Sequence, residues 1–434
     1  MDFSSTSKVS ILKAFSKNFW TVIVMEFFER GSYYGVMSVL SVYLILNANE
    51  GGLGFSKESV GIIKSTITPL LYFLPILSGA IADRFGYRKT LMFAFVMMSL
   101  GYFLTSLFTS YVLVFMSLIL MAIGAGFFKP IISGTIARTT DKSNSTLAFG
   151  IYYWSINLGA FLFPLILVPI LKQISWKYIF IMAAVGTGWL LLLNLFVYKE
   201  PDKPESTKTL KNVLIDMFKV LGDFRFVIMI VIYSGFWILY FQQFDTVLWY
   251  VKDYVDTTPV NNLVNSFLSI FVSNPNWKFD VEHVTVINAG TIIILQIFIS
   301  NFVKNKKALP TMIGGIALGT LGMAILAIST HPFVFIAGIF IFSIGEMTAH
   351  PKFISYVGLI APEDKKALYL GYAFLYGVLG SGIGGILGAN LYVHFVDNLK
   401  NPTLLWIIFS SIGLLTIVGL LLYNKFLAPK NVDA

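Results

Sequence analysis

Long apolar runs recur along the whole chain and are separated by short polar segments. Most of them hold about 20 residues or more, which is the length that an α-helix needs to cross a bilayer. The pattern predicts about twelve membrane-spanning helices, at residues 19–46, 58–82, 90–109, 112–137, 147–171, 178–198, 224–251, 284–303, 309–330, 333–360, 368–395 and 403–424. We therefore expect an all-α, polytopic membrane protein.

A polar segment rich in lysine, at residues 199–223, divides the runs into two sets of six. We expect an N-terminal six-helix bundle at residues 1–198, a cytoplasmic linker at 199–223 and a C-terminal six-helix bundle at 224–434. Carriers with this plan bind their substrate between the bundles, near the middle of the membrane. A second polar segment, at 252–282, contains an apolar stretch at 263–272. This stretch is too short to span the bilayer and predicts a helix at the membrane surface.

Composition supports the membrane assignment. Of the 434 residues, 56% are hydrophobic and 12% are charged, and the mean hydropathy is +0.78; soluble globular proteins do not have this balance. The net charge of +9 comes mainly from lysines and arginines in loops on one predicted side, such as residues 84–89 and 304–307. This bias places both termini in the cytoplasm and the helices in the cell membrane, and it argues against a nucleic-acid partner. The first 18 residues are polar and basic, so we expect no cleavable signal peptide. Because the chain has no cysteine, disulfides, thiolate metal sites and thiol catalysis are excluded.

Three charged residues lie within five positions of the first apolar run: Glu26, Glu29 and Arg30. A charge at bilayer depth costs roughly 3 kcal/mol on insertion scales, so we expect these groups to face a polar interior and to neutralise one another. Glu26 and Arg30 are four residues apart and share one helical face, which Tyr33 and Tyr34 continue. We interpret this face as part of a substrate or proton pathway. The alternative is a neutralised cluster with a structural role only.

Polar residues inside the other runs differ in charge between the halves. The N-terminal half adds a second cation, Lys129, deep in the fourth run, whereas the C-terminal half contributes the acids Asp245 and Glu346. A cavity between the halves would be positive on one wall and negative on the other, which suits a zwitterion longer than an amino acid. Its carboxylate would lie against the cations. Its ammonium would lie against Glu346, assisted by two amide side chains, Asn157 and Asn288.

These residues also have other interpretations. Lys129 could pair with the glutamates of the first run, either instead of the substrate or in alternation with it. Glu346 could be held neutral by burial and would then bind an ammonium poorly. His350, one turn after Glu346, could carry protons or simply pack. Asp245 could lie near the outer end of its span, away from the site.

Several segments resemble motifs of the proton-dependent oligopeptide transporters, which are part of the major facilitator superfamily. Residues 26–35 read EFFERGSYYG and resemble the ExxERFxYYG motif of the first helix. Residues 152–159 read YYWSINLG and resemble the FYxxINxG motif of helix five. Residues 124–130 (GAGFFKP), 345–351 (GEMTAHP) and 83–89 (DRFGYRK) resemble the motifs of helix four, helix ten and the loop between helices two and three. The resemblance runs from about residue 26 to 388.

The resemblance implies the major facilitator fold, with about twelve transmembrane helices in two six-helix bundles. It also implies a proton-coupled symporter that imports di- and tripeptides by alternating access. The peptide carboxylate would bind Arg30 and Lys129, and the amino group would bind Asn157, Asn288 and Glu346. The pocket would be lined by Tyr33, Tyr34, Tyr72 and Tyr153. Proton coupling is assigned to Glu26 and Glu29, with Asp245 and His350 as further candidates.

The chain also departs from the family pattern. Family members commonly have a second arginine where this chain has Met37, and an acid where it has Phe241. Those two groups are thought to pair across the cavity, and both are missing here; Asp245, one turn beyond Phe241, could replace the acid. Gly31 stands in place of a phenylalanine and Ala373 in place of a tryptophan. His350 likewise stands in place of a serine.

These departures keep a second function open, a carrier of the same fold for a non-peptide or peptide-like solute such as an amino-acid conjugate, a siderophore or a drug. An enzyme is not expected, because the chain has no HExxH, serine-elbow or phosphate-loop motif. A channel is not expected either, since no repeated pore segment or ring of charges is visible. We expect a monomer whose partners are a small solute, protons and the lipid bilayer. It would need no cofactor beyond the proton gradient.

Overall fold

The structure is a computed structural model that describes residues 15–141, 144–201 and 210–429. Eleven helical segments in this part of the chain are long and apolar enough to cross a membrane. The remaining predicted span corresponds to α1 (Lys17–Met37), which is less apolar because it carries Glu26, Glu29 and Arg30. The prediction of an all-α protein with about twelve spans is confirmed.

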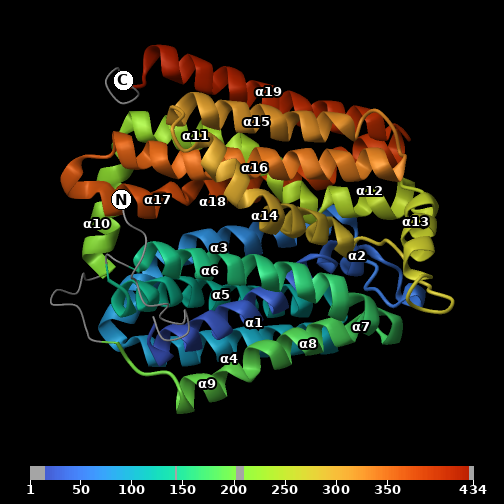
Figure 1. The fold of residues 1–434 in the computed structure, drawn as a ribbon, viewed down its shortest axis with the longest axis horizontal. Coiled ribbons are helices and arrows are strands. Elements are labelled where there is room, and N and C mark those ends of the chain that lie inside the picture. Colours follow the sequence, from blue (N-terminus) through green and yellow to red (C-terminus); the bar gives the residue numbers. More distant parts are fainter. Residues whose placement is uncertain (1–14, 142–143, 202–209, 430–434) are drawn as a thin grey trace, which may run out of the picture.

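The helices form two groups, which Figure 1 shows one above the other. The lower group, blue to green, contains α1, α2 (Leu40–Ile45), α3 (Lys57–Phe85), α4 (Tyr87–Leu107), α5 (Tyr111–Thr139), α6 (Ser145–Leu162), α7 (Val168–Ile174), α8 (Lys177–Gly188) and α9 (Leu190–Phe196). The upper group, yellow-green to red, contains α11 (Phe224–Phe241), α12 (Thr246–Tyr254), α13 (Thr258–Leu268), α14 (Glu282–Val303), α15 (Ala308–Ile325), α16 (Pro332–Ile360), α17 (Lys366–Ala373), α18 (Leu375–Tyr392) and α19 (Pro402–Phe426). Between them in sequence lies α10 (Leu210–Leu221).

Several spans that the sequence predicts as continuous helices are interrupted. The first breaks between α1 and α2, and the fifth passes through a π-helical turn, η3 (Phe163–Leu167), before α7. In the seventh span, α11 ends at Phe241, and a short 3₁₀ turn, η4 (Gln242–Phe244), follows before α12. At this last break the Gln242 side chain donates to the carbonyl oxygens of Ile238, at 2.9 Å, and Gly384, at 3.1 Å. The side chain thereby stabilises backbone that has left the regular helix.

The two groups meet along two seams, one between α3 and α18 and the other between α6 and α14. Small residues make the first seam close. A Cβ added at Gly385 would lie 2.6 Å from the Ser65 Oγ and 2.9 Å from the Gly61 carbonyl oxygen. On the other side of α18, a Cβ at Gly380 would lie 2.6 Å from the Cβ of Trp237. The glycines of α18 therefore serve close helix packing.

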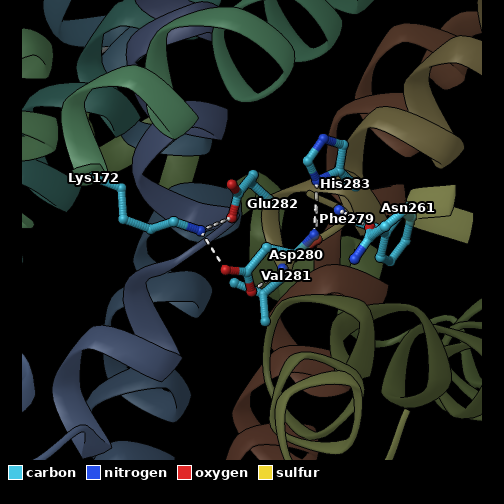
Figure 2. A network of polar contacts seen from close by, with 7 residues as sticks. All are labelled: Lys172, Asn261, Phe279, Asp280, Val281, Glu282 and His283. Carbon is cyan, nitrogen blue, oxygen red and sulfur yellow. Dashed lines mark hydrogen bonds and ion pairs between the residues drawn. The ribbon is translucent and has the colours of Figure 1, made fainter. Parts of the chain in front are cut away.

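Ion pairs join the two groups at one end of the bundle. We call it the distal end, which is the end away from the start of α1 and the end of α19 (Figure 1). There the Lys57 Nζ lies 2.8 Å from the Asp397 Oδ1. The Lys172 Nζ lies 2.8 Å from the Asp280 Oδ2 and 2.6 Å from the Glu282 Oε2 (Figure 2). These contacts hold the two groups together at the distal end.

Candidate functional site

A small cavity lies between the two groups of helices. Twelve side chains line it: Arg30, Tyr33, Tyr34, Met37, Lys64, Thr68, Leu71, Tyr72, Lys129, Tyr240, Phe241 and Phe244. Its volume of about 30 Å³ suffices for about one or two water molecules. A larger solute can enter only if the lining side chains move.

The charged cluster of α1 is almost fully buried, and its Arg30 lines the cavity. The Arg30 guanidinium binds Glu29 through two hydrogen bonds, of which Nη2 to Oε1 measures 2.6 Å. Glu26 is held less firmly, since its Oε1 lies 3.6 Å from the Arg30 Nε. Its Oε2 is buried without a close hydrogen bond to any residue that the structure describes, although the Tyr152 hydroxyl of α6 interacts with this carboxyl group. Two carboxylates therefore share one guanidinium, and Glu26 is the less satisfied of the two.

Lys129, on α5, supplies a second cation to the same cavity. Its Nζ lies 5.2 Å from the centre of the Tyr72 ring, within cation–π range. Within the described ranges, no carboxylate comes within ion-pair distance of this ammonium, although Glu26 and Glu29 act on it electrostatically. This side chain is thus available to an anionic group of a solute.

A third cation, Lys64, was missed in the sequence. Its Nζ lies 3.1 Å from the Asp245 Oδ1, and both side chains are buried, with 4% and 7% exposed. Lys64 belongs to α3 and lines the cavity, whereas Asp245 follows η4, so this ion pair joins the two halves beside the cavity. The Lys64 Nζ also lies 3.8 Å from the Met37 Sδ. The pair therefore lies beside the two positions where the family has its own charged pair, Met37 and Phe241.

The three residues assigned to the amino end of a peptide lie outside the cavity lining, and so does Tyr153, which was predicted to line the pocket. Asn288 donates to the Glu346 Oε2 at 2.9 Å and to the Ser343 Oγ at 3.0 Å. The Asn157 side chain donates to the Tyr153 carbonyl oxygen of its own helix at 2.9 Å. Tyr153 is 45% exposed.

His350 lies in an aromatic cluster. Its ring centre is 5.3 Å from that of Trp237 and 5.6 Å from that of Tyr376. The Tyr233 hydroxyl lies 3.5 Å from the His350 Nδ1. These contacts favour the packing interpretation of this histidine.

Local packing explains another departure from the family motif. A Cβ added at Gly31 would lie 2.4 Å from the ring of Phe163, which comes from the π-helical turn η3. Phe163 thus fills the space where a side chain at position 31 would lie. Close packing also explains the glycine of the helix-five motif, because a Cβ at Gly159 would lie 2.6 Å from the Phe27 carbonyl oxygen.

Known membrane transporters are similar to this chain in sequence. The family model described as Major Facilitator Superfamily matches residues 20–385. The chain is 32% identical over 185 residues to an uncharacterized transporter, YclF, of Bacillus subtilis (strain 168), which covers 42% of this chain and 37% of that protein. It is 29% identical over 237 residues to a di-/tripeptide transporter of Lactococcus lactis subsp. lactis (strain IL1403), which covers 51% and 45%. The chain spans less than half the length of these curated relatives.

Solved structures show the same fold over nearly the whole chain. A peptide transporter POT in complex with sulfate superposes with a TM-score of 0.76 at 21% identity, covering 97% of this chain and 98% of that one. A POT family transporter in complex with 5-aminolevulinic acid superposes with a TM-score of 0.76 at 22% identity, covering 94% of this chain and 96% of that one. The resemblance found in the motifs is confirmed by these matches.

Proposed function

Since the chain belongs to the Major Facilitator Superfamily, we propose that it is a proton-coupled carrier that imports di- and tripeptides by alternating access. The chain is a multi-pass membrane transporter and not an enzyme. The observation that carries the proposal is the cavity between the halves, where no carboxylate of the described residues pairs with the Lys129 ammonium on one wall. Such a site suits a solute with a carboxylate at one end.

In this proposal Lys129 and Arg30 bind the substrate carboxylate. The tyrosines of α1 and α3 pack against the peptide backbone. Glu346 attracts the substrate ammonium, and Asn288 holds the carboxylate of Glu346 in place. Asn157 and Tyr153 join the site only when the halves move, because they lie outside the lining in this conformation.

Proton coupling would begin at Glu26. This buried carboxylate has only a long contact to Arg30 and an interaction with the Tyr152 hydroxyl, so a proton there breaks no short ion pair. Neutralising Glu26 removes one of the two carboxylates that share Arg30, so that a substrate carboxylate can bind this guanidinium beside Lys129. The proton and the substrate thus favour each other's binding through one charge network. Glu29 keeps Arg30 in position, and the halves rock about the loaded site.

We also propose that the distal end faces the outside of the cell membrane and that both termini lie in the cytoplasm. The positive-inside bias of the loops supports this orientation. The carrier would act as a monomer, without a cofactor, and the proton gradient would supply the driving force.

One observation favours the second function, transport of a non-peptide or peptide-like solute. The cross-cavity charges that the family places at positions 37 and 241 are moved here to Lys64 and Asp245. This change alters the cavity wall that a ligand would touch. A structural neighbour in complex with 5-aminolevulinic acid, a small zwitterion, adds support to this alternative.

Uptake of labelled di-alanine and tri-alanine into proteoliposomes, with and without an inward proton gradient, tests the proposal. We expect gradient-driven accumulation that is lost in Lys129→Ala and Glu346→Gln. It should persist in Lys425→Ala, which removes an exposed lysine at the end of α19. Folded protein that takes up no peptide would contradict the peptide assignment, and a panel of amino-acid conjugates would then identify the solute class.

A further inference from the structure

A charge-free hairpin lies at the distal end, at residues 257–277 between α12 and α14. One face of its helix, α13, packs against the protein through Val260 and Val264. The other face and the following turn expose large apolar side chains. The exposed fractions are 60% for Leu263, 61% for Phe267, 71% for Ile270, 71% for Phe271 and 56% for Val272.

Water is a poor solvent for this face. Lipid-facing positions of the spans have the same exposure, for example 71% for Ile297 and 70% for Phe298 on α14. The hairpin begins shortly after the end of α12 and ends shortly before the start of α14. These two helices therefore keep both of its ends close to the membrane. In Figure 1, α13 runs across the direction of the spans and not along it. A helix with one apolar face and further polar positions such as Asn261 and Asn265, held at this level, is suited to the interface of the bilayer.

The hairpin is connected to the ion pairs that close the distal end. The Asn265 side chain makes two hydrogen bonds to the Trp277 backbone, at 2.9 and 2.8 Å. The Asn261 Oδ1 accepts from the Phe279 N–H at 2.7 Å, as the right part of Figure 2 shows. The next residue along the chain is Asp280, which binds Lys172 of the other half.

We propose that the apolar face of residues 263–272 lies in the outer-surface lipids of the membrane, and that the hairpin thereby positions the acids that bind Lys172. Membrane contact fixes the height of α13. The hydrogen bonds of Asn261 and Asn265 fix residues 277–279 relative to α13, and these residues directly precede Asp280. The partner of this surface is the lipid itself, and the proposal holds whatever solute the carrier moves.

The chain has no cysteine, so single labelling sites can be introduced cleanly. Phe271→Cys is labelled with an environment-sensitive fluorophore and reconstituted in vesicles of phosphatidylcholine with and without brominated acyl chains. We expect blue-shifted emission and quenching by the brominated lipid, as for Ile297→Cys on α14. Ala48→Cys, on an exposed distal turn, should give neither signal. If the label at Phe271→Cys emits at the same wavelength as the label at Ala48→Cys, and iodide in the water quenches it equally, the proposal is overturned.

The link to the ion pairs has its own test. Spin labels at Ile174→Cys, at the end of α7, and Lys278→Cys report the distance across the distal end. We expect this distance distribution to broaden when Phe267 and Phe271 are both changed to Asn, and to stay narrow with Ile297→Asn. An unchanged distribution in the folded double variant would show that the hairpin does not position the acids.

Discussion

The buried ion pair between Lys64 and Asp245 leads to a quantitative prediction about stability. Its two partners come from different halves and are almost completely shielded from water, with 4% and 7% of the side chains exposed. Replacing one partner leaves the other as an uncompensated buried charge, which costs about 3–5 kcal/mol. We therefore expect Lys64→Met and Asp245→Val each to lower the free energy of unfolding by this amount.

Replacing both partners has a different expected result. The apolar pair Lys64→Met with Asp245→Val leaves no buried charge, and such replacements are commonly neutral or stabilising by about 1–4 kcal/mol. The double variant should thus recover most of the stability that each single variant loses. A double variant as unstable as the sum of the single changes would refute this reasoning, because the two side chains would then act independently.

Unfolding of purified protein, followed by tryptophan fluorescence in denaturant, measures these differences. A matched control is the exposed pair Lys366–Glu363, whose Nζ and Oε1 are 2.8 Å apart with 43% and 90% of the side chains exposed. Lys366→Met should change the free energy of unfolding by less than about 1 kcal/mol. A loss of several kcal/mol in the control would show that any lysine change destabilises this protein.

Three further predictions concern coupling, packing and pH. Glu26→Gln should abolish proton-driven accumulation while counterflow exchange of substrate persists, and accumulation retained in this variant would contradict the coupling scheme. Gly345→Ala should destabilise by about 1–3 kcal/mol, as measured by denaturant unfolding, because its Cβ would lie 2.4 Å from a backbone nitrogen of α15; Gly358→Ala, with open space around it, is the control. Burial by itself would raise the pKa of Asp280, but the Lys172 ammonium and the hydrogen bonds to this carboxyl group together have the larger, opposite effect. The pKa of Asp280 therefore lies below the ordinary value of 3.8. Since a carboxyl group with a lowered pKa stabilises the folded state above its ordinary pKa, the contribution of Asp280 to the distal spin-label distance should be kept down to about pH 4 and be lost below it.

The fold was predictable because its signals are local. Apolar runs of the right length are properties of contiguous residues, and so is the charged cluster of α1. The breaks inside the spans were not predictable in this way. The end of α11 at Phe241 depends on Gln242 reaching Gly384 on a helix far along the chain.

The site was predictable in part for the same reason. Arg30 and Lys129 were found because a charge inside an apolar run is conspicuous, and both line the cavity. Lys64 carries the same signal, but it lies close enough to the predicted start of its run to be taken for a flanking residue. The role of Lys64 depends on its ion pair with Asp245, and only the packing of the two halves brings these two side chains together. Asn157 was placed in the site by its motif, whereas its side chain bonds to its own helix in this conformation.

The ion pairs that close the distal end are partly open to solvent: the Asp397 and Asp280 side chains are 37% and 47% exposed. Dissolved ions screen such charges, with a Debye length of about 8 Å at physiological ionic strength and about 3 Å at 1 M. The buried pairs of the cavity are protected from this screening. The closed distal end should therefore become less favourable as the salt concentration rises on that face of the membrane, while salt on the opposite face leaves it unchanged. The carrier's conformational equilibrium would then respond to the salinity of one compartment alone.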